Sequence, residues 1–198
     1  ARPNLRARLL KPNPGANGQP TPPAPAVALP VVTYDQPLTL QLNGEEVRVV
    51  PLPPSHTDGD SAVKFVNADV LATGDVFRST GYPNIDRANG GTLKGLLESM
   101  DIFLSLAGPN TKVSPGHGNV TDRAALQAHK DVIITVRDRV AKLKKEGKTV
   151  EQIVGEPLVV QRLGSSAERS ARIDELLEMV GLSPEHRRRL PADLSGGQ

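Results

Sequence analysis

Three residues with metal-binding side chains follow short apolar stretches, each in a turn rich in glycine or proline. His56 lies in PSHTDGD, Asp75 in TGD and His117 in PGHG. If the strands before these turns lie side by side in one sheet, the three side chains converge at one edge. Two neutral imidazoles and one carboxylate suit zinc or another borderline divalent metal, and they leave positions for water and substrate. Taken singly, each residue suits an exposed turn better than a metal site, and only the joint pattern is specific.

Short β-like segments precede these residues along the chain. Residues 38–42 alternate apolar and polar side chains, and Asn43-Gly44 is a strong signal for a hairpin turn. The other predicted strands are 47–52, 62–66, 70–73 and 112–114. These strands would place the three candidate ligands just beyond strand ends.

Three amphipathic stretches are predicted to be helices, because their apolar residues recur at spacings of three and four. They cover 92–107, 122–146 and about 167–180. Thr121 is the expected N-cap of the second helix, and Gly147 and Gly181 would end the second and third. His129 falls on the apolar stripe of the second helix and is expected to be packed, whereas His186, beside three arginines, is expected to face solvent.

The composition limits the class of protein. The 198 residues include no cysteine, so a disulfide, a thiolate zinc site and a cysteine nucleophile are excluded, and any metal is held by His, Asp or Glu. The net charge of +2 is too small to indicate a nucleic-acid partner. No apolar window reaches the roughly 18 to 20 residues of a membrane span. No signal peptide is visible, so we expect a soluble, cytoplasmic protein.

The chain is predicted to have three parts. Residues 1–28 form a basic arm and a linker rich in proline and glycine, because eight of the 18 prolines fall in the first 30 residues. Proline excludes helix interiors and central strands from this linker. Residues 29–154 contain the predicted sheet with its candidate site, and residues 155–198 form a helical appendage.

The middle part, residues 29–154, resembles the C-terminal half of a metallo-β-lactamase-fold hydrolase. The resemblance rests on the blocks PSHTDGDSAVKF, VLATGDVF, YPNIDRANGGT and VSPGHG, in this order. It implies an α/β (α+β) fold, a truncated half-sandwich of β-sheet with flanking helices. It also implies that His56 belongs to a first metal position and His117 to a second, with Asp75 bridging or leaning toward the second. The loop 82–91 would lie near the site.

The family's principal ligand motif, H-x-H-x-D-H, does not occur in these 198 residues. Residues 2–10 resemble the short helix that follows this motif, so the sequence is expected to start just downstream of it. Most of the family's metal-binding side chains are then missing. Asp58 or Asp60 could complete a reduced site, although both equally suit turn capping. Asp86 could hydrogen-bond to the ligand residues without contacting the metal, or it could be an ordinary turn residue.

The end of the chain, about 155–198, is similar to the helical subdomain of the ATP-binding subunit of peptide-type ABC transporters. The similarity runs through GEPLVVQRLGSS and RIDELLEMVGLSPEHRRRLPADLSGGQ, which ends in the LSGGQ signature. An ATPase also needs a G-x-x-x-x-G-K-[ST] phosphate loop, and the sequence contains none. We therefore expect this tail to be a helical packing element.

The expected function is that of a metal-dependent hydrolase with a reduced site. His56, Asp75 and His117 would hold one or two Zn²⁺ ions, or another divalent metal, which lowers the pKa of bound water toward about 7. Metal-bound hydroxide would attack an ester, phosphoester or lactam, a small-molecule substrate. Asp58 is a weak candidate for orienting the water.

Two other hypotheses stay open. A half-sandwich leaves a sheet face and an edge unprotected, so the chain could be a non-catalytic chimeric fragment that self-associates. A homodimer or higher homo-oligomer is expected under this hypothesis and under the hydrolase hypothesis. The third is a nucleotide-binding module, which the missing phosphate loop disfavours.

Overall fold

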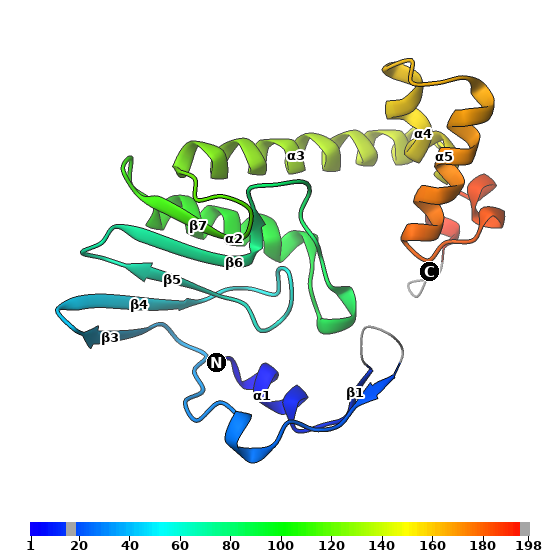
Figure 1. Cartoon of the computed structure of the whole chain (residues 1–198). Coiled ribbons are helices and arrows are strands. Elements are labelled where there is room, and N and C mark those ends of the chain that lie inside the picture. The colour runs from blue at the N-terminus through cyan, green and yellow to red at the C-terminus, as the bar shows by residue number, and fades with distance from the viewer. Residues whose placement is uncertain (15–18, 195–198) are drawn as a thin grey trace. The chain divides into compact units, whose positions relative to one another are not determined.

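The computed structural model describes residues 1–14 and 19–194. The chain divides into two compact units, 1–131 and 132–198, and the division falls within one long helix (Figure 1). The first unit has the predicted mixed α/β architecture, and the second is helical. The sequence predicts boundaries after residues 28 and 154. These boundaries stay predictions.

One five-stranded sheet forms the centre of the first unit. Its strands are β3 (Leu38–Leu42), β4 (Glu45–Pro51), β5 (Ser61–Phe65), β6 (Val70–Arg78) and β7 (Lys112–His117), adjacent in that order. Neighbours are antiparallel from β3 to β6, whereas β6 and β7 are parallel. Each strand overlaps a predicted one, but β6 and β7 extend further than expected.

A two-residue turn joins β3 to β4. Asn43 and Gly44 have φ values of 52° and 75°, the left-handed pair that a type I′ turn requires and that Asn-Gly adopts readily. β3 is one of the two edge strands of the sheet, and Leu40 and Leu42 on it are exposed. Self-association through such an edge stays a prediction.

Helix α2 (Leu93–Leu106) connects β6 to β7 and covers the sheet (Figure 1). It begins after Thr92, whose hydroxyl oxygen accepts a hydrogen bond from the backbone N–H of Gly95 at 2.9 Å. The Thr92 hydroxyl also donates to the carbonyl oxygen of Pro54 at 2.7 Å. The start of α2 is therefore tied to the loop that carries His56.

Helix α3 (Arg123–Lys145) begins one residue later than predicted. The carboxylate of Asp122, rather than the hydroxyl of Thr121, accepts the hydrogen bond from the backbone N–H of Ala125, at 3.0 Å. Gly147 follows the helix with φ of 73°, as its predicted role as a helix terminator requires.

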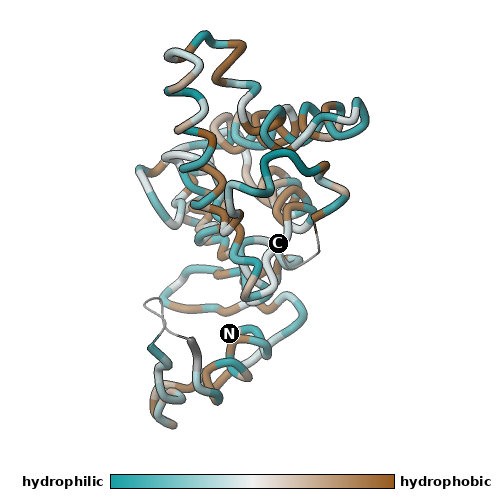
Figure 2. Tube along the Cα trace, turned by 90° about the vertical axis from the view of Figure 1, so that its right-hand side faces the viewer, coloured by the Kyte–Doolittle hydropathy of each residue, from teal (hydrophilic) through white to brown (hydrophobic). Residues whose placement is uncertain are grey.

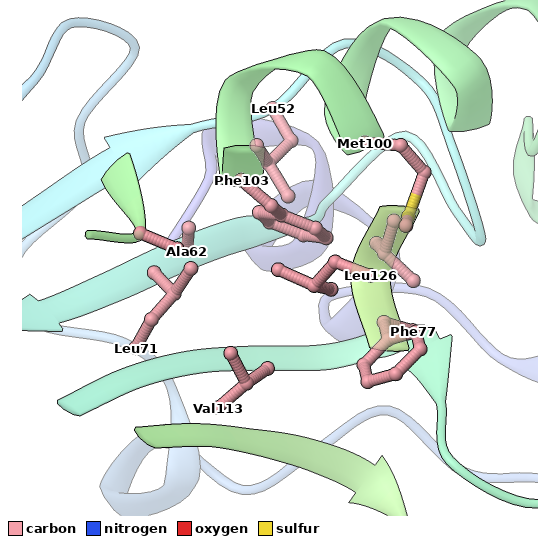
Figure 3. Close-up of a cluster of buried hydrophobic side chains, with 10 residues drawn as sticks. Leu52, Ala62, Leu71, Phe77, Met100, Phe103, Val113 and Leu126 are labelled. Carbon is pink, nitrogen blue, oxygen red and sulfur yellow. The ribbon is translucent and has the colours of Figure 1, made fainter. Parts of the chain in front are cut away.

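The hydrophobic core of the first unit lies between the sheet and the helices (Figure 3). Only 3% of the residues are aromatic, so aliphatic side chains and two phenylalanines fill this space. The buried cluster comprises Leu52, Ala62, Leu71, Val76, Phe77, Met100, Phe103, Ala107, Val113 and Leu126. Its members come from the strands β5, β6 and β7, from the helices α2 and α3, and from the segments next to them.

His129 of α3 packs beside this core, as its position on the apolar stripe predicts. Its ring meets the ring of Phe77 edge-on, with centroids 5.1 Å apart and planes at 87°. Burial lowers the pKa of His129 below its usual 6.5, because an apolar environment disfavours the imidazolium ion.

The first unit is therefore expected to lose stability as the pH falls through about 6.5. In that range the unfolded state binds more protons than the folded state, because His129 is more basic when unfolded. Urea unfolding at about pH 7.5 and about pH 5.5 measures the loss. His129→Leu should lose less stability between these pH values than the wild type. Equal losses in the two proteins would contradict the assignment.

The N-terminal segment, expected to be an arm and linker, contains short elements. They are α1 (Pro3–Leu9), β1 (Asn13–Pro14), β2 (Pro20–Thr21) and the 3₁₀ helix η1 (Ala26–Ala28). α1 has no buried residue, and polar contacts attach it. Arg2 donates to the carbonyl oxygen of Leu52 at 3.1 Å, and Arg6 donates to that of Pro30 at 3.2 Å.

The second unit contains helices that pack on each other. After the end of α3 come α4 (Val150–Val160), α5 (Ser166–Met179) and the 3₁₀ helices η3 (Pro184–Arg188) and η4 (Pro191–Asp193). α5 matches the predicted third helix, whereas α4 was not predicted. Its start is a capping box in which Thr149 and Gln152 exchange hydrogen bonds. Val150, Ile173 and Leu177 form the small buried core of the second unit.

Arg187 joins three elements of this unit. Its guanidinium donates to both carboxylate oxygens of Asp174 on α5, at 2.8 and 2.9 Å, and to Glu151 on α4 at 2.6 Å. Leu194 packs against the core of the unit, and the other residues of the LSGGQ signature, 195–198, lie outside the described residues. The packing role expected for the tail is consistent with these contacts.

His186 corrects one expectation from the sequence. It is buried, 6% exposed, rather than facing solvent. The 3₁₀ turn η3 folds its ring back, so that Nδ1 accepts a hydrogen bond from the backbone N–H of Ser183 at 3.1 Å. The adjacent arginine run suggested an exposed surface, but the tight turn places this one side chain inside.

Within the described part of the chain, no helix has the length and apolar character to cross a membrane. The hydropathy colouring of Figure 2 shows hydrophobic and hydrophilic stretches alternating along the helices of this part of the chain.

Candidate functional site

Asp75 lies in an irregular stretch inside β6, not beyond the end of a strand as the sequence suggested. Ala72 pairs with Ser114 and Gly74 with Pro115, and the register shifts between and after these pairs. Gly74 has φ of 56°, a conformation that glycine adopts without strain. The strand resumes to Arg78, so a bulge rather than a strand end presents the carboxylate.

His56 lies in the loop between β4 and β5, and a backbone carbonyl fixes its ring. Nδ1 of His56 lies 2.7 Å from the carbonyl oxygen of Asn84. A carbonyl only accepts hydrogen bonds, so Nδ1 carries the hydrogen and Nε2 of the neutral ring is left with a free lone pair. The backbone N–H of Asp86 donates to the carbonyl oxygen of His56 at 2.9 Å, which ties the two loops together.

His117 is the last residue of β7 and stands opposite Arg78 of the parallel strand β6. The backbone N–H of Ser79 donates to the carbonyl oxygen of His117 at 3.1 Å. A Cβ on Gly116 would overlap a carboxylate oxygen of Asp75. Glycine at this position therefore lets β7 approach the carboxylate closely.

The structure brings the three predicted ligands together in pairs. Nε2 of His56 lies 3.7 Å from Oδ2 of Asp75, and Nε2 of His117 lies 3.3 Å from Oδ1 of the same residue. In the neutral form of His56 two acceptors face each other, and a cation or a proton between them would relieve their repulsion. A carbonyl behind the imidazole and a bare Nε2 in front of it are typical of histidine ligands.

These donors fit a divalent metal by type and by pairwise approach. Among the residues described, however, no group of three or more His, Asp or Glu side chains is arranged to hold a metal ion. Zinc takes nitrogen and oxygen ligands at about 2.0 to 2.2 Å, so binding would require the side chains to move from these positions.

A cavity of about 560 Å³ adjoins these residues. His56 and Asp75 contribute to its lining from the sheet side, and Arg8 and Lys11 contribute from the N-terminal segment. This volume falls in the range of small-molecule sites, roughly 300 to 1,000 Å³.

The other carboxylates considered from sequence have local partners. Asp58 forms an ion pair with Arg8, and its expected role of orienting water stays a prediction. Asp60 accepts hydrogen bonds from the backbone N–H and the hydroxyl of Thr57, both at 2.8 Å, as a turn-capping residue does.

Asp86 caps the 3₁₀ helix η2 (Arg87–Asn89). The side-chain hydrogen bond from Asn89 holds the pKa of Asp86 below its usual value, so the carboxylate is ionised and committed to this turn. It also positions the backbone N–H that supports His56.

Sequence reasoning missed two participants, Asn84 and Arg8. A histidine ligand needs an acceptor for its second nitrogen, but the sequence does not show which carbonyl will supply it. In the sequence Arg8 was only one residue of a basic arm. Because 50 residues separate it from Asp58, no local pattern indicated that the two form an ion pair.

No family model matches this chain. Part of it is similar to ATP-binding subunits of transporters. It is 36% identical over 83 residues to the oligopeptide transport ATP-binding protein OppF of Bacillus subtilis (strain 168), covering 41% of this chain and 27% of that protein. It is 51% identical over 45 residues to a putative peptide import ATP-binding protein of Brucella abortus (strain 2308), covering 23% and 14%.

Part of the chain is also similar to solved structures. The sec-alkylsulfatase Pisa1 from Pseudomonas sp. matches with a TM-score of 0.54 and 20% identity, over 69% of this chain and 22% of that one. A metallo-β-lactamase from Pontibacter korlensis matches with a TM-score of 0.47 and 20% identity, over 54% and 49%. The chain therefore spans less than half the length of each of these four proteins. The chain thus shares the fold of the alkylsulfatase, its solved neighbours include a metallo-β-lactamase, and part of it is similar to transporter ATP-binding subunits, in agreement with both sequence resemblances.

Proposed function

We propose that the first unit is a metal-dependent hydrolase in which His56, Asp75 and His117 bind Zn²⁺ or another divalent metal. The observation that supports this most directly is the approach of two imidazole Nε2 atoms to one carboxylate, at 3.7 and 3.3 Å, beside a cavity. The fold shared with hydrolases is consistent with the proposal.

Each residue has a separate task in this proposal. Asn84 holds His56 in the tautomer that leaves the lone pair of Nε2 free. One carboxylate oxygen of Asp75 faces His56 and the other faces His117. A divalent metal bound there would polarise a carbonyl or phosphoryl oxygen and make a water acidic enough to attack near neutral pH. The cavity would hold the substrate, an ester, phosphoester or lactam.

A metal titration with matched variants tests this proposal. Purified protein, stripped of metal, should bind about one Zn²⁺ per chain by calorimetry, and His117→Ala should bind it at least about tenfold more weakly because one ligand is lost. His129→Gln is the control, since it removes a histidine of the same unit that does not line the cavity.

Hydrolysis is measured on the same proteins with 4-nitrophenyl acetate, 4-nitrophenyl phosphate and a chromogenic β-lactam. We expect turnover of at least one substrate by the wild type and by His129→Gln, with a loss in His117→Ala. Absence of zinc binding, or full activity in His117→Ala, would reject the hydrolase proposal.

A further inference from the structure

We propose that the cavity selects an ester that carries a second, anionic group, and that Arg8 and Lys11 of the N-terminal segment recognise this group. The inference rests on the proposed hydrolase function, because it names the class of substrate for the same site. Neither residue belongs to the candidate ligand set. Both line the cavity together with His56 and Asp75.

Two parts of the chain line the cavity, and their side chains differ in chemistry. The loops of the sheet supply His56 and Asp75, and the N-terminal segment supplies Arg8, Lys11 and the apolar side chain of Leu9. A substrate with a reactive carbonyl group at one end, an aliphatic middle and an anion at the other end matches this lining.

Arg8 is held in position by its ion pair with Asp58, in which Nη1 meets a carboxylate oxygen. The Arg8 side chain is 28% exposed, so part of it is accessible to a ligand from solvent. A guanidinium has five N–H donors in a rigid plane, and the Asp58 contact involves Nη1. A fixed guanidinium with donors to spare binds a carboxylate or phosphate with little further loss of entropy.

Lys11 adds a positive charge to the cavity. It is exposed and forms no ion pair within the described part of the chain. Because an ammonium group on a flexible stem reaches oxygen anions from several directions, Lys11 can follow ligands of different length.

The two carboxylates in the lining, Asp60 and Asp75, have partners other than Arg8 and Lys11. Asp60 is directed at its own turn by two hydrogen bonds from Thr57. Asp75 faces the histidines at 3.3 and 3.7 Å. Asp58 neutralises part of the charge of Arg8, so recognition by Arg8 rests on its remaining N–H donors. Lys11 supplies the positive charge that no carboxylate pairs with in the described part of the chain.

Binding measurements on metal-stripped protein test the inference without relying on activity. The probes are monomethyl succinate, an anionic ester, and dimethyl succinate, its neutral counterpart. We expect the monoester to bind at least about tenfold more tightly, and Arg8→Gln and Lys11→Met each to weaken its binding by about tenfold, the scale of a hydrogen bond to a charged group. Isothermal calorimetry or ligand-observed NMR gives these affinities.

Arg6→Gln is the matched control. It removes the same charge from the same helix, but Arg6 donates to the carbonyl oxygen of Pro30 and does not line the cavity. It should leave binding of the monoester within about twofold of wild type. Lys11→Met guards against a folding artefact, because an exposed lysine in a loop can be replaced without disturbing packing.

Inorganic phosphate, added as a competitor, distinguishes two forms of the anion. Displacement of monomethyl succinate by phosphate supports a site open to phosphorylated substrates as well. Failure of phosphate to displace the bound monoester supports a site restricted to carboxylates.

Equal affinity for the two succinate esters would overturn the inference, and so would an Arg6→Gln effect as large as that of Arg8→Gln. The result is separable from the proposed function. Zinc binding and ester hydrolysis without preference for the monoester would reject only the substrate class. Selective binding of the monoester through Arg8 and Lys11, without any zinc binding, would reject the hydrolase proposal and leave an anion-binding cavity.

Discussion

Replacing Asp75 with alanine is expected to weaken zinc binding by at least about 100-fold and to reduce hydrolysis to background. The expectation follows from the geometry, because both Nε2 atoms approach oxygens of this one carboxylate. Substitution of a residue that only hydrogen-bonds to a metal ligand already costs about 10- to 100-fold in metal affinity. Removal of a ligand itself should cost more. The carboxylate is also the anionic member of the set, so its loss leaves two neutral imidazoles.

Zinc titration by calorimetry measures the first effect, and release of 4-nitrophenol measures the second. Asp101→Asn is a suitable control, since it removes a negative charge of the same unit from an exposed ion pair with Lys130. Zinc affinity in Asp75→Ala within about threefold of that of Asp101→Asn would show that the carboxylate is not a ligand. Circular dichroism spectra of both variants establish that the fold is retained.

Gly95→Ala is expected to destabilise the first unit by about 2 kcal/mol, even though alanine is the better helix former. Helix propensity alone favours alanine over glycine by about 1 kcal/mol. A Cβ at this position, however, would overlap the carbonyl oxygen of Pro54. Overpacking against backbone typically costs about 1 to 3 kcal/mol, and this overlap belongs at the upper end of that range.

The variant should also affect the site, because Pro54 lies two residues before His56 in the loop that Thr92 anchors. Urea unfolding measures the stability, and zinc titration shows whether the loop has moved. Gly155→Ala is the matched control, since its Cβ would come closest to Cδ1 of Ile173, at 2.7 Å, the movable end of a side chain. A gain in stability for Gly95→Ala would mean that propensity outweighs packing.

Local sequence signals predicted most elements of the fold. The alternation at 38–42 and the Asn43-Gly44 turn correctly indicated a hairpin, since both depend on neighbouring residues alone. Periodicity likewise found α2, α3 and α5. Helix α4 escaped because Gly155 and Pro157 interrupt its pattern, and its capping box and packing against α5 stabilise it nonetheless.

Non-local contacts explain the remaining differences. Asp75 seemed to follow a strand, because Gly74 usually marks a turn, but pairing with β7 carries β6 on to Arg78. The arginine run beside His186 indicated an exposed segment, yet a 3₁₀ turn buries that ring.

By itself the sequence determined which side chains could bind a metal, since without cysteine only His, Asp and Glu were available and three of them stood in glycine- or proline-rich turns. Only the tertiary structure decided that His56 and His117 approach one carboxylate and that Arg8 reaches the same cavity. The reason is physical. Turns and helix periods depend on residues a few positions apart. The contacts of the site depend instead on the register and bulge of β6, and on the ion pair between Arg8 and Asp58, which lie 50 residues apart in the sequence.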